Sequence, residues 1–165
     1  MDWYTFLIIT HIIGTVLGAG GATFIEIFYL KAKRDNVFEP YEIDYIRIAV
    51  LVSRIGLAIL IVSGFGFLLL YRLSGANEML LASKLWAKLA IVLVLIFNTY
   101  LIQARKISMI IGSSLYLTSW YAALILGAWR SLTVSFISII IFYIIAVVLV
   151  ALILKIIEKR LQIKL

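Results

Sequence analysis

Four ionisable side chains stand inside long apolar stretches of this sequence: His11, Glu26, Arg54 and Lys88. An ionisable group in a hydrocarbon layer is costly, so it usually faces the interior of a helix bundle and marks a binding site, an ion route or a proton relay. An imidazole can ligate a metal or carry a proton. A lysine or arginine can hold a carboxylate. These four residues are therefore the candidate functional residues.

The depths of these groups sort them into two levels. If successive apolar runs alternate in direction, the helical rise puts His11 and Lys88 at one level, in the outer half of the bilayer. Glu26 and Arg54 then share the inner level, where they predict an ion pair or part of a polar route. Each residue also has a structural interpretation. Glu26 and Arg54 could form a purely structural pair, Lys88 could extend to the headgroups as Lys84 does, and His11 could be a satisfied core donor.

Small residues follow His11 along the same run, at Gly14, Gly18 and Gly21. Gly14 and Gly18 form a GxxxG pattern, which lets two helix backbones approach closely, within one chain or between two copies. The missing side chains could instead make room for a flat cofactor beside the histidine. The sequence leaves both interpretations open, and it offers the Gly14/Gly18 face for a homo-oligomer.

The elements that carry these residues are predicted by composition. Hydrophobic residues make up 65% of the 165 positions and charged residues 14%. A soluble domain of this length could not bury so much apolar surface, so lipid must cover part of it. Long continuous apolar runs favour helices, because the strands of a membrane barrel would alternate over shorter segments. The sequence therefore predicts an all-α, polytopic transmembrane helical bundle whose main partner is the lipid bilayer.

One crossing takes about 20 apolar residues, and we expect five spans in a single domain over residues 1–165. They cover approximately residues 3–30, 46–71, 80–102, 107–128 and 132–154. A polar loop from Lys31 to about Tyr45 contains the only proline, and residues 74–77 form a turn. The fourth span is rich in serine and threonine and could be re-entrant. The fifth, rich in Ile and Val, is expected to face lipid.

Basic residues predict the orientation. Ten Lys and Arg residues lie at the odd-numbered span boundaries, and three lie at the even-numbered ones (Arg72, Lys84 and Arg130). The positive-inside rule therefore puts the N-terminus outside and the C-terminus in the cytoplasm. The formal charge of +7 is explained by these helix ends and by contacts to anionic lipid, so no nucleic acid is expected. The absence of cysteine excludes disulfides, Fe–S clusters and thiolate metal sites.

Three segments resemble a group of small prokaryotic membrane proteins that includes the HemJ-type protoporphyrinogen oxidases and the copper-resistance protein CopD. The likeness covers roughly residues 5–106. Its segments are His11-Ile12-Ile13-Gly14 with Gly20-Gly21, then Val52-Ser53-Arg54-Ile55-Gly56-Leu57 with Val62-Ser63-Gly64, and finally Lys84-Leu85-Trp86-Ala87-Lys88-Leu89-Ala90 with Gln103-Ala104-Arg105.

The resemblance implies a function. HemJ-type enzymes depend on a histidine of helix one and a lysine of helix three and are associated with haem b, and these residues correspond to His11 and Lys88. The chain would then be a plasma-membrane oxidoreductase that takes hydrogen from a porphyrinogen and passes electrons to haem or a quinone. His11 would be the haem iron ligand or a proton acceptor, and Lys88 would hold a propionate or carboxylate. Gly14, Gly18 and Gly21 would border the cofactor.

This sequence also departs from the HemJ pattern. It lacks the usual Pro-Arg after helix one and the usual proline of helix two, and it has five expected spans rather than four. With one histidine, any second haem ligand must come from another side chain such as Lys88, from a second subunit, or be missing. Two alternatives therefore stand beside the oxidoreductase: a small ion or metabolite transporter using Glu26, Arg54 and Lys88, and a non-catalytic membrane subunit.

Overall fold

The computed structural model describes residues 2–34, 38–129 and 134–163, and this part of the chain is helical without a strand. The helices are α1 (Trp3–Ala32), α2 (Pro40–Leu73), α3 (Asn77–Leu81), α4 (Ser83–Gln103), α5 (Met109–Ala128) and α6 (Phe136–Ile163). All except the short α3 are long and apolar enough to cross a membrane. The predicted helical membrane bundle with five spans is confirmed, and the serine-rich fourth span is a continuous helix.

The start of α2 differs from the sequence-based expectation. Pro40 to Tyr45 belong to the helix rather than to the polar loop. Proline suits the first turn because its fixed φ is helical and its missing N–H has no intrahelical acceptor there. Glu42 closes a capping box, its Oε2 accepting the Glu39 backbone N–H at 3.4 Å. Local capping thus extends α2 well beyond its apolar core, to about 51 Å for 34 residues.

Other boundaries also bear on the predicted spans. The turn expected at residues 74–77 is present around Gly75, whose φ of +72° is suited to glycine, and α3 follows it. At the other end of the chain, α6 continues beyond the predicted end at residue 154 as far as Ile163. The predicted start of that span at residue 132, and Arg130 and Lys164 of the charge count, lie outside the described residues.

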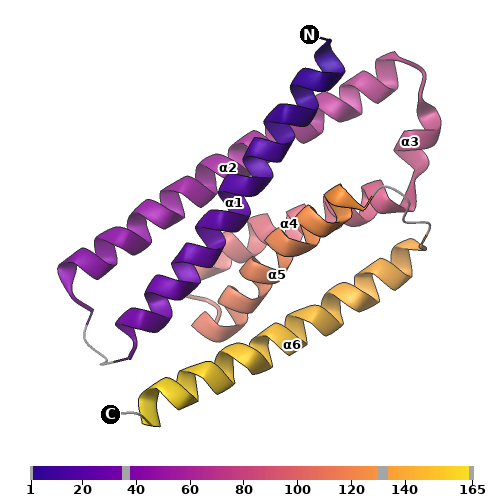
Figure 1. Cartoon of the computed structure of the whole chain (residues 1–165). Helices are drawn as coiled ribbons and strands as arrows, with labels where there is room; N and C mark the ends of the chain where they lie inside the picture. Colours follow the sequence, from indigo (N-terminus) through magenta and orange to yellow (C-terminus); the bar gives the residue numbers. More distant parts are fainter. Residues whose placement is uncertain (1, 35–37, 130–133, 164–165) are drawn as a thin grey trace.

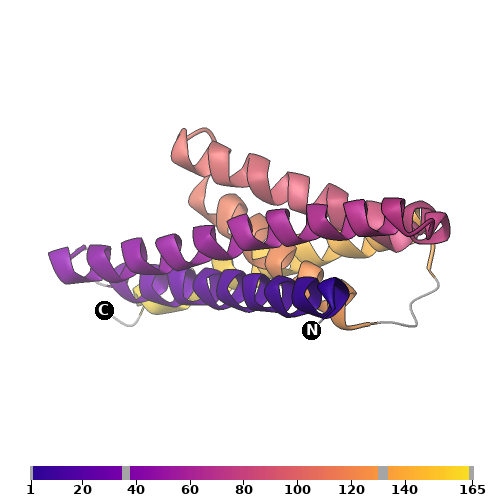
Figure 2. The ribbon, with the colours of Figure 1, turned by 90° about the horizontal axis from the view of Figure 1, so that it is seen from above.

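Two groups of helices make up the bundle (Figures 1 and 2). Helices α1 and α2 lie side by side along most of their length, and α4, α5 and α6 form the second group. Helix α5 joins the groups because it contacts α1, α4 and α6. Helix α6 is the least buried of the five long helices, as the lipid-facing expectation requires.

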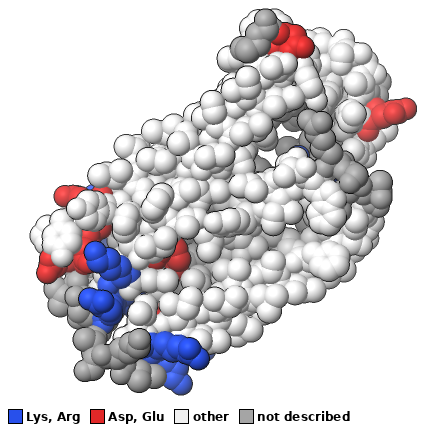
Figure 3. All heavy atoms as spheres, in the orientation of Figure 1, with Lys and Arg blue, Asp and Glu red and all other residues white. Residues whose placement is uncertain are grey.

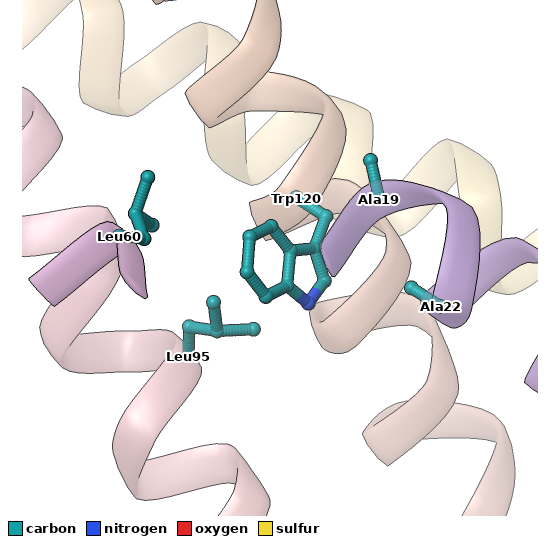
Figure 4. Packing of buried hydrophobic residues seen from close by; sticks show 5 residues of the cluster. All are labelled: Ala19, Ala22, Leu60, Leu95 and Trp120. Atoms are coloured by element: carbon teal, nitrogen blue, oxygen red, sulfur yellow. The ribbon is translucent and has the colours of Figure 1, made fainter. Parts of the chain in front are cut away.

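Trp120 is the largest side chain of the central core and is fully buried. Figure 4 shows its indole between Ala19 and Ala22 of α1 on one side and Leu60 of α2 and Leu95 of α4 on the other. One aromatic ring therefore contacts both groups of helices. A second cluster joins α4, α5 and α6 and consists of Ala87, Ile91, Leu126, Ile139 and Tyr143.

Charged residues gather at the ends of the bundle. Figure 3 shows basic side chains clustered at the end where α1 stops and the C-terminus lies, while the N-terminus is at the opposite end. Lys33 of the segment after α1 forms an ion pair there with Glu158 of α6. The positive-inside prediction expects basic residues to gather at this end. Which end faces the cytoplasm stays a prediction.

Candidate functional site

His11 lies on the face of α1 that packs against α2. Its Nδ1 is 2.9 Å from the Ser63 hydroxyl oxygen, and the Ser63 hydroxyl donates to the Ile59 carbonyl at 2.7 Å. A serine has one proton to give, and since this proton goes to the backbone, the serine oxygen acts as acceptor toward the imidazole. The Nδ1–H tautomer follows, so Nε2 keeps its lone pair. That nitrogen can bind a metal or accept a proton.

The imidazole is held from a second direction as well. The ring of Phe67 lies edge-on to it, with ring centroids 5.6 Å apart and planes at 82°. Gly64 leaves space beside the ring, since a Cβ there would be 3.8 Å from His11 Cε1. Ser63 and Phe67 are four residues apart on α2, so one face of that helix fixes the orientation of His11.

Lys88 lies close enough to His11 to act electrostatically on the imidazole. Lys84, one turn earlier on α4, interacts electrostatically with Lys88, and its ammonium donates to the backbone carbonyl of Trp129. Lys84 and Lys88 thus bring two cationic groups close together at this end of the bundle. Figure 3 shows the surface hollowed near the end that carries the N-terminus. An anionic group is the ligand that such a site would attract.

The glycines are covered by protein atoms. A Cβ on Gly14 would be 2.9 Å from the backbone N of Leu60, and one on Gly21 would be 2.8 Å from the backbone N of Ser53. A Cβ on Gly18 would lie 2.0 Å from the ring of Trp120. These residues therefore serve close packing of α1 against α2 and α5 within one chain. The Gly14/Gly18 face expected for a homo-oligomer is occupied in the same way.

The inner pair is not brought together. Glu26 is buried with 8% of its surface exposed, and its carboxyl group is hydrogen-bonded to the Ser113 side chain of α5. Arg54 is exposed, and the described residues contain no ion pair between it and Glu26. The reason is rotation about α2: Ser53 faces α1, and the next residue points roughly 100° away from it. An exposed Arg54 can extend its long side chain toward the headgroups.

Hydroxyl groups lie between the two levels. Ser53 donates to the Gly18 carbonyl at 3.1 Å and is 2.7 Å from the Tyr116 hydroxyl of α5. Further along α1, the hydroxyls of Thr23 and Tyr121 are 3.0 Å apart. A discontinuous set of polar groups therefore follows the contact of α1 with α2 and α5 from His11 to Glu26, with Trp120 packed among them.

Several of these residues are not among the candidates that the sequence predicts. Ser63 belongs to the Val62-Ser63-Gly64 segment, and Ser113 belongs to the serine-rich fourth span. The signal that could have found the residues of α5 is spacing, because Ser113, Tyr116 and Trp120 recur at intervals of three and four and therefore share one face of the helix. Asn98 of α4, buried and donating to the Gly112 carbonyl at 2.8 Å, is a further example.

Haem is the cofactor that the resemblance implies, and these residues fit one part of such a site. The lone pair of His11 Nε2 could hold the haem iron, with the Nδ1–H held by Ser63 as histidine ligands commonly require. The glycine face does not fit the ring, because α2 and Trp120 fill it. Within the described residues, no group of three His, Cys, Asp or Glu residues could hold a free metal ion.

No family model matches the chain, and no curated protein or solved structure is significantly similar to it. The relation to HemJ-type and CopD-type proteins therefore rests on the three sequence segments and stays a prediction.

Proposed function

We propose that the protein is a haem-associated oxidoreductase of a prokaryotic plasma membrane, acting on an apolar substrate that bears carboxylates, such as a porphyrinogen. The observation that carries the proposal is the orientation of the His11 imidazole, whose Nδ1 is 2.9 Å from the Ser63 hydroxyl, with Lys88 close enough to act on the ring electrostatically. Haem would supply the electron acceptor when bound. His11 would hold it, and Lys88 would hold a carboxylate of the substrate or cofactor. A quinone is the natural next acceptor in the surrounding lipid.

The binding of the substrate follows from this arrangement. A tetrapyrrole is apolar over its ring and anionic at its edge, so it can enter from the lipid while its carboxylates reach a cationic site. Lys88 is half-buried, which strengthens its attraction for an anion relative to a fully hydrated lysine. Ser63 keeps the imidazole in one orientation, so that the iron-binding nitrogen is not lost to ring rotation.

An absorption spectrum tests the proposal directly. Purified wild-type protein, loaded with haem b, should give a Soret band that shifts on reduction with dithionite. His11→Ala should abolish the band, whereas Ser63→Ala should keep it with a changed position. A matched control is Lys106→Ala at the distant end of α4, which should leave the spectrum unchanged. A wild-type protein that never takes up haem would sink the proposal.

A second function, proton-coupled transport, is supported by one specific observation. Glu26 is buried in the apolar interior, and hydroxyls of Ser53, Tyr116 and Thr23 lie between it and His11. Buried carboxylates in membrane bundles commonly relay protons. In this case the route would use Glu26 and Lys88 but not Arg54, which is exposed.

Flux measurements separate the two functions. Proteoliposomes containing a trapped pH dye should show proton movement that Glu26→Gln slows at least tenfold, while Glu39→Gln at the exposed start of α2 has no effect. Wild-type flux equal to that of empty vesicles would remove the transport candidate without touching the haem proposal.

A further inference from the structure

An apolar cavity of about 530 Å³ opens between α5 and α6. His11 is not among the residues that line it. The cavity wall is formed mainly by residues of α5 from Leu117 to Trp129 and by residues on the α6 side such as Phe142, Tyr143 and Ala146. A volume of this size is typical of pockets for a small ligand.

The lining selects a hydrocarbon. The hydroxyl oxygen of Thr118 is buried away from the cavity surface, and the Tyr143 hydroxyl is 2.9 Å from Ser119 Oγ. Almost no polar atom is therefore left to meet a polar ligand group inside the cavity. A quinone head or a sugar would lose its hydrogen bonds on entering, whereas an acyl chain would not.

The cavity is elongated along one helix. From Leu117 to Trp129 its wall follows about 18 Å of α5. An extended acyl chain can lie along an apolar wall of this length.

A cation lies at one end of this cavity. The ammonium of Lys84 donates to the backbone carbonyl of Trp129, and Trp129 is part of the cavity wall. An ammonium carries three N–H donors, so two remain for an anion. Lys88, one turn away, adds to the positive potential at this end. Tryptophan side chains at such a position are typical of the headgroup level of a bilayer.

From these observations we infer that the cavity binds one anionic phospholipid, with an acyl chain between α5 and α6 and its phosphate at Lys84. The lipid would join α4 to the α5–α6 pair, because its headgroup contacts one helix and its chain the other two. This site is new, and it does not depend on whether the protein is an oxidoreductase or a transporter.

Native mass spectrometry of the delipidated protein tests the headgroup. Palmitoyl-oleoyl phosphatidylglycerol and phosphatidylcholine would be offered at equal concentration. We expect one phosphatidylglycerol to be retained with about a fivefold preference, the effect of one basic residue near a lipid phosphate. Lys84→Gln should abolish the preference, and Lys106→Gln should keep it. Equal retention of both lipids by the wild type would overturn the inference, as would the same loss in both lysine variants.

The acyl chain needs its own test. Phosphatidylglycerol with a photoreactive diazirine in its acyl chain should crosslink wild-type protein at cavity residues such as Ile125 and Phe142. Ala146→Phe fills the cavity and should reduce this labelling at least fivefold. Ala58→Phe, at an exposed alanine of α2, should leave it unchanged. The crosslinked residues are identified in the wild-type protein, so this result holds even if Ala146→Phe fails to fold. Adducts spread over all lipid-facing helices would overturn the assignment.

Discussion

Gly18 and Trp120 illustrate how one pair of residues fixes the packing of two helices. The indole lies directly over the glycine, so that the nearest ring carbon would be 2.0 Å from an added Cβ. The ring is fully buried and cannot move aside without displacing Leu60 or Leu95. The space that could have held a flat cofactor is used by a flat side chain of the protein itself.

Gly18→Ala should therefore destabilise the bundle. Overpacking of a rigid core costs about 1–3 kcal/mol, and we expect a loss of that size in the free energy of unfolding, measured by steric trapping in detergent. Gly20→Ala is the matched control, because no atom lies within 4 Å of its added Cβ. It should be neutral or slightly stabilising. Trp120→Leu should restore part of the stability lost in Gly18→Ala, and additive losses would contradict the contact.

The tautomer of His11 gives a second prediction. As the only histidine, it contributes a single imidazole to a nitrogen-15 spectrum. We expect a protonated Nδ1 and an unprotonated Nε2, because the Ser63 oxygen accepts from Nδ1. Ser63→Ala removes that acceptor, so the two tautomers should become mixed and the protein should lose about 1 kcal/mol of stability. Ser83→Ala, at an exposed serine, should change neither. A protonated Nε2 in the wild type would contradict the arrangement.

Among the elements, α6 packs mainly against α5 and α4, and its Glu158 forms an ion pair with Lys33, which follows α1. Lys33 and Glu158 have 27% and 14% of their side chains exposed, so water screens the pair only in part. Its contribution should lie at the upper end of the range for surface pairs. This contact ties the last helix to the first at one end of the bundle.

A double-mutant cycle measures that contribution. Lys33→Ala, Glu158→Ala and the double variant should give a coupling of about 0.5–1 kcal/mol in unfolding free energy. The exposed pair Arg47–Asp44, 3.3 Å apart within α2, should give about 0.3 kcal/mol or less. A coupling for Lys33–Glu158 no larger than that of the control pair would show that the contact does not hold α6.

The five long helices could be predicted because hydrophobicity accumulates along each run and does not depend on neighbours. Their ends could be predicted less well, since Pro40 and Glu42 start α2 through local capping that an apolar run does not reveal. The depths of the polar residues can be predicted from the helical rise, and Lys88 lies close enough to His11 to act on it electrostatically. The rotation of each helix about its own axis could not be predicted in this way, because the face that a helix buries depends on the helix packed against it. Arg54 points outward for that reason.

At the scale of the whole molecule, the bundle has two unlike ends. One holds His11, Lys84 and Lys88 together with the mouth of the apolar cavity, and the other holds Glu26 and the Lys33–Glu158 pair. Which end faces the cytoplasm decides from which leaflet a lipid or an apolar substrate would arrive. The positive-inside rule predicts that the His11 end faces outward.

The absence of native cysteine makes this orientation measurable, because any introduced cysteine is unique. Ser74 follows α2 at the His11 end and Ala104 follows α4 at the other, and both are exposed. In intact cells a membrane-impermeant maleimide should label Ser74→Cys, while Ala104→Cys should react only after lysis. The reverse pattern would invert the topology and put the His11 site near the cytoplasmic leaflet. The proposed phospholipid would then have to come from that leaflet, so this labelling also decides which lipids can reach Lys84.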